Sequence, residues 1–150
     1  MPDALDRKIL NLLQVDAMCT IKDIAKRLKL TNTPVHERIK KLEKQGIIKA
    51  YRAIVDNEKV EKSQIVLLQL HMEAYIPSNI AGFEKQVMKM PQVLECYHLA
   101  GTIDYQLKII VKDIKEYDSF LMTMANVPNV SVVSSFIVLH PVKQTTFIQL

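Results

Sequence analysis

Residues 30–46 read LTNTPVHERIKKLEKQG, and this stretch decides the architecture of the first third of the chain. The three residues before the proline are all types that cap helices, and proline itself is tolerated only in a first helical turn. Gly46 is the residue type that commonly follows a last helical turn. A helix is therefore predicted from this cluster of caps to Gln45.

The predicted helix has two unlike faces. At about 100° per residue, Val35, Ile39 and Leu42 share one side and need an apolar surface to bury them. The other side is polar and mainly basic, with Thr33, Glu37, Lys40, Lys41 and Lys44, and His36 on its flank. A basic helix that follows a short turn and another helix is typical of the helix-turn-helix, whose later helix lies in the major groove of DNA.

Two helices are predicted before this one and a hairpin after it. Asp3 can cap the first helix and Thr20 the second, because apolar residues recur at helical spacing after each. Apolar and polar residues then alternate over 47–55, which predicts a small hairpin, or wing. Lys49 and Arg52 on that wing would be available to phosphates.

The charge of the chain is concentrated in its first 60 residues. Residues 1–60 hold 13 Lys and Arg against 8 Asp and Glu, whereas residues 61–150 hold 7 against 8. A basic unit has an electrostatic reason to meet a polyanion, because each neutralised phosphate releases counterions. The helix pattern alone also describes a plain soluble bundle with lysines outside, but the asymmetry of charge favours nucleic acid.

Composition excludes several other classes of protein. The 150 residues are 49% apolar with three glycines, which excludes a disordered or fibrous chain. Apolar runs no longer than Ile65–Leu68 fall far short of the ~20 residues that cross a bilayer, so no membrane partner is expected. The N-terminus lacks a secretory pattern, and Cys19 and Cys96 are expected to be reduced thiols of a cytoplasmic protein.

A polar linker at 56–62 is predicted to separate a domain of residues 1–55 from a domain of residues 63–150. In the second domain the order is β-α-β-β-α-β: strands Ile65–Glu73, Val93–Leu99, Asp104–Val111 and Val130–Leu139, and helices Ile80–Met90 and Ile114–Ala125. This order is the ferredoxin-like arrangement, so the chain is predicted to be α+β. Residues 142–150 are a candidate additional edge strand.

Three details of the second domain can be predicted further. Ser78 and Asp113 are the expected helix caps. The buried stripe of the second helix is expected to comprise Ile114, Tyr117, Leu121 and Met124. Both faces of the sheet are largely apolar, but two helices cover only one, so a second copy of the sheet is the expected cover and the chain is predicted to form a two-fold dimer.

Several motifs together resemble the Lrp/AsnC (feast/famine) family of bacterial and archaeal transcription regulators. They occur in the family's order and spacing over essentially the whole chain: residues 5–10 (LDRKIL), 13–17 (LQVDA), 33–43 (TPVHERIKKLE), 46–48 (GII), 101–105 (GTIDY) and 136–139 (FIVL). The resemblance implies an N-terminal winged helix-turn-helix and a C-terminal ferredoxin-like domain. It further implies dimers, often built into octamers, and a small effector, commonly an amino acid, bound between dimers.

The resemblance makes the helix at 31–44 the recognition element for double-stranded DNA. Its implied base-edge contacts are Thr33, His36, Glu37 and Lys41, and its implied phosphate contacts are Arg38, Lys40 and Lys44. Thr31 and Asn32 at the start of the helix, and Lys49 and Arg52 after it, complete the expected DNA-binding set.

The resemblance places effector contacts in the turn between the two middle strands and in the last strand. The turn comprises Ala100, Gly101, Thr102, Ile103 and Asp104. A glycine there lets backbone N–H groups approach a carboxylate, and an aspartate can accept from an ammonium group. Family members often carry two threonines where this chain has Val133 and Ser135, so one hydroxyl is lost. Met122 on the preceding helix could face an apolar effector, or simply pack between dimers.

Nothing in the sequence favours catalysis or a cofactor. The four histidines are scattered, the two cysteines lie far apart, and no phosphate loop, nucleophile elbow or metal-ligand spacing is present. A non-enzymatic regulator is therefore predicted. An architectural protein that wraps DNA with weak sequence preference is an alternative, and so, with less support, is a regulatory module whose helical domain contacts protein.

Overall fold

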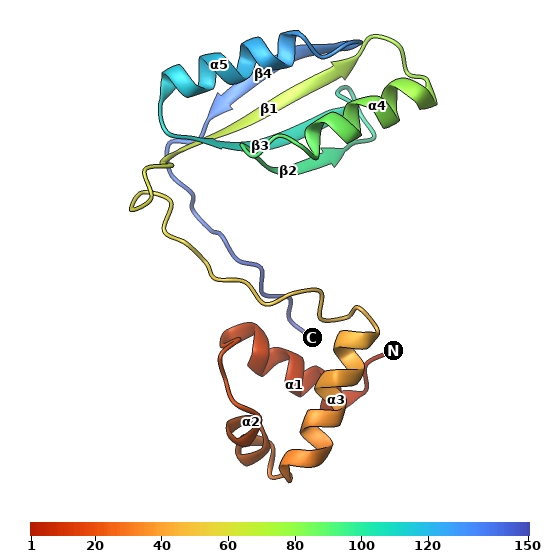
Figure 1. Ribbon diagram of the computed structural model, residues 1–150, viewed down its shortest axis with the longest axis vertical. Helices are drawn as coiled ribbons and strands as arrows, with labels where there is room; N and C mark the ends of the chain where they lie inside the picture. The colour runs from red at the N-terminus through yellow and green to blue at the C-terminus, as the bar shows by residue number, and fades with distance from the viewer. The chain divides into compact units, whose positions relative to one another are not determined.

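The computed structural model describes residues 1–150 and divides them into two units (Figure 1). The first unit comprises Met1–Ile54 and Lys143–Leu150, and the second comprises Val55–Val142. None of the five helices is both long enough and apolar enough to cross a bilayer. The predicted α+β class is confirmed, with three helices before a mixed helix and sheet unit.

The first unit is built from α1 (Ala4–Val15), α2 (Ile21–Leu28) and α3 (Asn32–Lys44). Both predicted caps are confirmed, since the Asp3 side chain accepts from two backbone N–H groups of α1 and the Thr20 hydroxyl accepts from Asp23 N of α2. Side-chain caps of this kind satisfy donors that the first helical turn leaves without a partner. α3 follows α2 after three residues, which is the helix-turn-helix connection.

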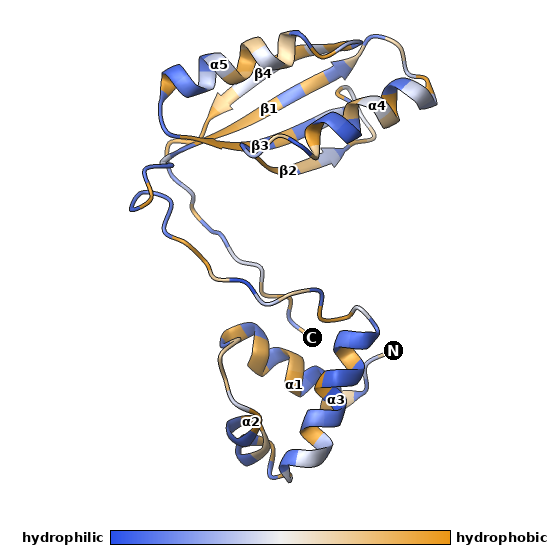
Figure 2. Cartoon of the chain, in the orientation of Figure 1, coloured by the Kyte–Doolittle hydropathy of each residue, from blue (hydrophilic) through white to orange (hydrophobic).

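The three helices bury the residues that their periodicity predicts. Val35, Ile39 and Leu42 of α3 are buried, as are Ile9 of α1 and Ile24 of α2. Figure 2 shows α3 as a largely hydrophilic helix with hydrophobic residues at intervals. Burying a Val, Leu or Ile side chain contributes about 1.5–3 kcal/mol, so this inner stripe is what fixes α3 on the other two helices.

The predicted wing after α3 is wrong, because residues 45–63 contain no strand. Its first residues close the helix instead: the N–H groups of Ile47 and Ile48 donate to the Leu42 carbonyl, at 3.0 and 3.2 Å. Gly46 supplies the left-handed conformation that this closure needs, with φ +68°. The remaining alternating residues find no partner strand in the chain, and Ile54 is 93% exposed.

The second unit has the ferredoxin-like order. It contains β1 (Gln64–Met72), α4 (Pro77–Val87), β2 (Val93–His98), β3 (Tyr105–Val111), α5 (Ile114–Ala125) and β4 (Val130–Ile137). The sheet order is β2-β3-β1-β4, and every neighbouring pair is antiparallel. Two crossovers, each through a helix, give this order and place α4 and α5 on one face of the sheet (Figure 1).

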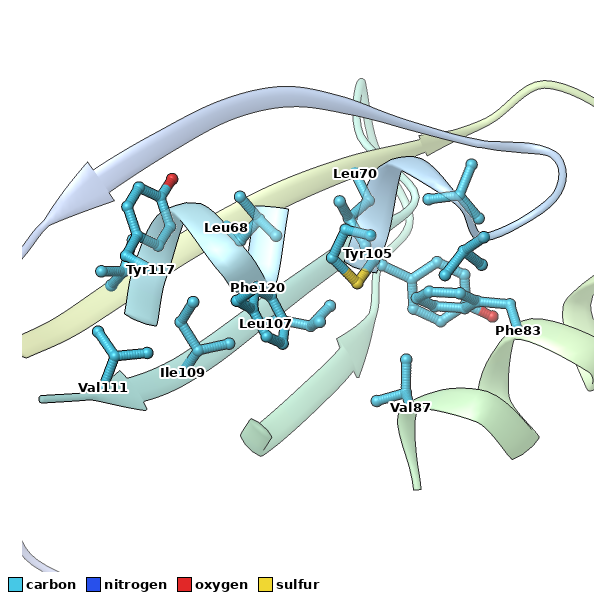
Figure 3. Close-up of a cluster of buried hydrophobic side chains, with 14 of the residues drawn as sticks. Leu68, Leu70, Phe83, Val87, Tyr105, Leu107, Ile109, Val111, Tyr117 and Phe120 are labelled. Atoms are coloured by element: carbon cyan, nitrogen blue, oxygen red, sulfur yellow. The ribbon is translucent and has the colours of Figure 1, made fainter. Parts of the chain in front are cut away.

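The core of the second unit lies between that face and the two helices. Figure 3 shows Leu68 and Leu70 of β1 and Leu107 of β3 among the side chains packed there. The rings of Phe83 and Tyr105 meet edge to face at 4.6 Å between centroids. The face of β1 that is turned to the helices consists of the alternate residues from Val66 to Met72, which are all buried.

Two details of the helices differ from prediction. Ser78 does not cap α4, because the helix begins one residue earlier at Pro77, with Ile76 as its N-cap. Ile114 is 60% exposed, and the buried residues of α5 are Tyr117, Phe120 and Met124. Asp113 does cap α5, and Ile114 is the first residue of the helix.

A bulge in β4 changes which of its residues face the helices. The β1–β4 register shifts between Gln69, opposite Ser134, and Leu70, opposite Val132, so Val133 has no partner. Beyond the bulge Phe136 lies opposite Leu67, on the face that the helices do not cover. The candidate edge strand at 142–150 is also wrong, because these residues form no strand.

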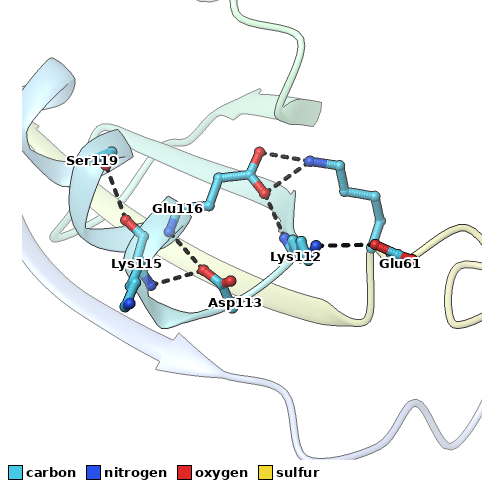
Figure 4. Close-up of polar contacts among 7 residues, drawn as sticks. Glu61, Lys112, Asp113, Lys115, Glu116 and Ser119 are labelled. Atoms are coloured by element: carbon cyan, nitrogen blue, oxygen red, sulfur yellow. Dashed lines mark hydrogen bonds and ion pairs between the residues drawn. The ribbon is translucent and has the colours of Figure 1, made fainter.

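An ionic network fixes the start of the second unit to α5 (Figure 4). Lys62 Nζ lies 2.6 and 2.8 Å from the two carboxylate oxygens of Glu116, and Glu116 also accepts from the Lys112 backbone N–H at 2.6 Å. Lys112 Nζ lies 3.0 Å from Glu61. These donors, the Lys62 ammonium first, hold the pKa of Glu116 below its ordinary 4.5.

Glu116 should therefore contribute to the acid sensitivity of the second unit. A carboxylate with a lowered folded-state pKa stabilises the fold above its unfolded pKa, and this contribution is lost as pH falls through the folded value. Glu116→Gln is expected to flatten the fall in unfolding free energy between about pH 5 and 3, measured by urea unfolding. Glu73→Gln, at an exposed carboxylate without an ion pair, is the control. Equal slopes in both variants would contradict the prediction.

Candidate functional site

The turn before α3 presents the start of this helix to solvent. Lys29 ends α2 in the left-handed conformation at φ 56°, and Leu30 N donates to the Ala25 carbonyl at 2.9 Å. Thr31 is the N-cap of α3, but its side chain makes no capping hydrogen bond. Thr31, Asn32 and Thr33 are all exposed, so their polar groups and the first backbone N–H groups of α3 are free to meet an outside partner.

The outer face of α3 is basic and exposed. Lys40, Lys41 and Lys44 are all exposed, as are His36 and Glu37. Lys40 Nζ lies 3.0 Å from Glu43 Oε2, and the Lys40 side chain is 64% exposed. Exposed pairs of this kind contribute about 1 kcal/mol or less, so the pair leaves Lys40 able to turn to a phosphate. Lys41 and Lys44 have no ion-pair partner in the chain.

Arg38 differs from the other basic residues expected to contact DNA. Its Nη1 atom lies 2.6 Å from Asp3 Oδ2 and 2.6 Å from Asp6 Oδ1. Asp6 is only 1% exposed, and its Oδ2 atom accepts from Asp3 N at 3.1 Å. The Asp6 backbone N–H, followed by the Arg38 guanidinium, holds the pKa of Asp3 below its ordinary value. Arg38 therefore joins α3 to the start of α1.

A signal for this ion pair was present in the sequence. Asp6 lies four residues before Leu10 and seven before Leu13, so it falls on the apolar side of α1. A carboxylate on a buried face needs a cation or hydrogen-bond donors, because an unpaired buried charge is costly. Arg38 is the cation that α3 places there.

Lys49 and Arg52 lie in the segment after α3 and are exposed. One contact ties this segment back to the helix, since Tyr51 Oη donates to Glu43 Oε1 at 3.1 Å. Burial first, and then the Glu43 carboxylate, raises the pKa of Tyr51, so the phenol stays protonated and can donate. The two cations thus follow α3 without the hairpin that was expected to carry them.

The loop between β2 and β3 contains five of the expected effector residues. Leu99 N donates to the Asp104 carbonyl at 2.8 Å and closes the loop. Ala100, Gly101 and Thr102 are exposed, and Ile103 and Asp104 are half-buried. Gly101 does not have a positive φ, and a Cβ atom added there would meet nothing within 4 Å. Neither the backbone nor the packing of a single chain therefore requires glycine at this position.

Asp104 is more than a loop residue. Its Oδ2 atom accepts from the Met72 backbone N–H at 2.7 Å and lies 2.8 Å from His71 Nδ1, and its own N–H donates to the Leu70 carbonyl at 3.0 Å. These bonds fix the base of the loop to the end of β1. One of the two carboxylate oxygens, Oδ2, is thus already engaged, although the carboxylate was expected to be available to an ammonium group.

The other expected effector residues lie on β4 and α5. Val133 is the unpaired residue of the bulge and is 55% exposed, and Ser135 lies opposite Leu68 and is exposed. Met122 is 62% exposed on the outer side of α5. The β1 residue Leu70 connects two of these regions, because it is bonded to Asp104 on one side and paired with Val132 on the other.

An aromatic cluster lies next to the loop, and no pattern in the sequence indicated it. Tyr75 Oη lies 2.7 Å from His98 Nε2, and the His98 ring stacks on Tyr105 at 4.5 Å. Tyr105 Oη donates to Glu84 Oε1 at 2.9 Å, and burial together with this carboxylate raises the pKa of Tyr105. The cluster fixes the end of β2 from which the loop begins. Cys96 on the same strand is a free, exposed cysteine.

Comparison with known proteins gives matches over both units. Residues 65–148 match the Lrp/AsnC ligand binding domain, and residues 2–49 match a winged helix-turn-helix DNA-binding domain. A leucine-responsive regulatory protein of Haemophilus influenzae is 35% identical over 149 residues, covering 99% of this chain and 90% of that protein.

Two solved structures are similar to this chain over nearly its whole length. An AsnC family transcriptional regulator from Agrobacterium tumefaciens has a TM-score of 0.89 at 34% identity, covering 97% of this chain and 95% of that one. A transcriptional regulator from Neisseria meningitidis, solved in complex with L-methionine, has a TM-score of 0.91 at 29% identity, with the same coverage.

Removing the Arg38 guanidinium should destabilise the first unit, because Asp6 would be left without its cation. Arg38 is 30% exposed, so the expected loss for Arg38→Gln is about 2 kcal/mol, between the values for exposed and fully buried pairs. Arg52→Gln removes an exposed, unpaired arginine and is expected to change stability by less than about 0.5 kcal/mol. Urea unfolding followed by circular dichroism measures both, and an unchanged midpoint for Arg38→Gln would return Arg38 to the phosphate contacts.

Proposed function

Because this chain belongs to the Lrp/AsnC family of transcription regulators, we propose that it binds double-stranded DNA sequence-specifically through α3 and that an amino acid modulates this binding. The observation that carries the DNA-binding half is the exposed, basic outer face of α3 on a helix-turn-helix. The match of the second unit to a ligand binding domain supports the other half.

The proposal assigns the DNA contacts by position on α3. Base edges are contacted by Thr33, His36, Glu37 and Lys41, which lie on the first and middle turns of the exposed face. Phosphates are contacted by the remaining exposed donors: Thr31, Asn32, Lys40, Lys44, Lys49 and Arg52. Arg38 supports the set from inside, because it holds α3 against α1.

The proposal places the effector at the loop 100–104 and the bulge of β4. Gly101 leaves open space and exposed backbone for a carboxylate, and Thr102 and Ser135 add exposed hydroxyls. Ala100, Ile103, Val133 and Met122 supply apolar surface. Since Asp104 already accepts from Met72, its part is to position the loop, and the ammonium group of the effector then depends on carbonyl or hydroxyl oxygens.

The proposal includes a homo-oligomer. The sheet face that α4 and α5 leave open carries Leu67 and Phe136, and Phe136 is 53% exposed. A second copy of the sheet covers such a face with two-fold symmetry, and a dimer lets two recognition helices meet two half-sites. Octamers built from such dimers, in the cytoplasm, are part of the same proposal. An effector that prefers one arrangement of dimers then shifts DNA affinity by linkage.

The first experiment is a fluorescence-anisotropy titration of the protein against the DNA upstream of its own gene, with a shuffled duplex as comparison. At ~50 and ~200 mM salt, a preference for the native fragment that survives the higher salt supports a specific regulator. Equal binding to both duplexes that collapses with salt supports the architectural alternative. Binding to neither contradicts the DNA-binding assignment and favours a protein partner.

Changing Lys40, Lys41 and Lys44 together to alanine should weaken DNA binding strongly, because each lost phosphate contact lowers the slope of log affinity against log salt by about 0.9. Loss of the base contact from Lys41 should also relax sequence preference. The matched control changes Lys85, Lys89 and Lys115 together to alanine. These lysines are exposed in the second unit, and their substitution removes the same charge. Equal effects of the two triples would show that α3 is not the recognition helix.

Gly101→Thr should separate effector binding from folding. The added side chain meets open space in the chain, so the thermal midpoint should change by no more than a few degrees. It should weaken the effect of L-leucine or L-methionine on DNA affinity at least about tenfold if a ligand backbone approaches this loop, a loss of about 1.4 kcal/mol. An unchanged response in the folded variant would move the effector elsewhere.

A further inference from the structure

The residues that follow β4 return to the DNA-binding unit. Residues 145–150, here called the docking segment, belong to the first unit, although the strand that precedes them belongs to the second. The chain therefore connects the two units twice, through residues 55–63 and again through the residues after Ile137. The second connection has no place in the function proposed above.

Two amides of α1 hold the backbone of the docking segment. Gln14 Nε2 donates to the Ile148 carbonyl at 2.9 Å, and Gln14 Oε1 accepts from the Ile148 N–H at 2.7 Å. Asn11, one turn earlier, donates from Nδ2 to the Leu150 carbonyl at 3.4 Å. Both backbone groups of Ile148 are thus bonded, as in a strand pair, with the side-chain amide of Gln14 in place of the partner backbone.

A shallow depression accompanies these amides. Leu12, Val15 and Leu28 contribute its apolar lining from α1 and α2, and Phe147 and Leu150 enter it from the docking segment. Phe147 and Leu150 are 41% and 46% exposed, so the contact is partial. The sequence of the segment, Thr145-Thr146-Phe147-Ile148, favours the extended conformation in which both backbone groups of Ile148 are available. No residue of α3 takes part, so the docked segment leaves the DNA-binding face free.

Such a contact is weak by itself but effective when tethered. Each hydrogen bond contributes about 1 kcal/mol net, and much of this is offset by ordering the segment. A short tether supplies an effective concentration of about 1 mM, so an intrinsic Kd of ~0.1 mM keeps the segment docked in about nine of ten molecules. An equilibrium of this size responds to small changes at either end.

We propose that the docking segment is a strap through which β4, and with it the effector region, acts on the DNA-binding unit. The seven residues from Val138 to Gln144 span at most about 23 Å, so the position of β4 limits where the segment can dock. Val133 and Ser135 lie on β4, so an effector bound there changes the docked fraction. This inference rests on the proposed function for its two ends. The docking of the segment on Asn11 and Gln14 of α1, here called the seat, is independent of that function.

The docking of the segment on α1 is tested by hydrogen exchange of the full chain in four forms: wild type and three variants. In wild type, residues 145–150 are expected to exchange about tenfold more slowly than in Gln14→Ala. The control Gln86→Ala, at an exposed glutamine of α4, should exchange like wild type. Phe147→Ser should lose the same protection from the other side of the contact. Residues 4–15 should stay protected in all forms, which separates release of the segment from unfolding of α1. Equal exchange of residues 145–150 in wild type and Gln14→Ala overturns the seat.

The coupling is tested by the anisotropy titration with L-leucine and L-methionine as probes. Gln14→Ala is expected to bind the native DNA fragment within about threefold of wild type but to lose most of the effector-induced change. Gln86→Ala should keep that change. A full effector response in Gln14→Ala overturns the strap. Absence of any response in wild type overturns the proposed function and the coupling with it, while the exchange comparison still decides the seat.

Discussion

The DNA-binding unit depends on one buried carboxylate. Asp6 lies inside the three-helix unit, where it accepts from the N-cap of its own helix and from Arg38 of α3. A charge in that position is tolerated only with a fixed partner, so the rotation of α3 about its axis is set by Arg38 as well as by Val35, Ile39 and Leu42. With that rotation fixed, the lysines of α3 face solvent. The same ion pair that stabilises the fold therefore determines which residues can reach DNA.

Two features of the chain are incomplete in a single copy. The open face of the sheet carries exposed apolar side chains, and the segment 49–55 alternates like a strand but pairs with nothing. Both features favour association of a monomer with another chain, because exposed apolar surface and unpaired strand backbone each promote binding. A regulator that works as an oligomer turns both into binding surfaces.

Much of the fold could be predicted because local signals and global packing agree. Asp3, Thr20 and Asp113 cap helices as their spacing predicts, and the stripe of Val35, Ile39 and Leu42 is buried as its periodicity predicts. The failures have tertiary causes. The wing is absent because Ile47 and Ile48 close α3. In β4, a bulge reverses which alternate residues face the helices, and the hydrophobic pattern of the strand does not predict a bulge. The role of Arg38 could not be predicted because its partner, Asp6, lies 32 residues away in the sequence. The role of Asp104 could not be predicted because it bonds Met72, at the end of a strand from another part of the chain.

The central strand explains how the expected effector residues can belong together although they are far apart in sequence. β1 has β3 on one side and β4 on the other, and at Leu70 it meets Asp104 on the first side and Val132 on the second. The loop 100–104 and the bulge at Val133 are therefore fixed to the same end of one strand. A ligand that shifts the loop acts on Asp104, which bonds β1 at both Leu70 and Met72, and β1 passes that shift to the one place in β4 where the ladder is already interrupted. The ladder is interrupted there because the extra residue, Val133, has no partner on β1.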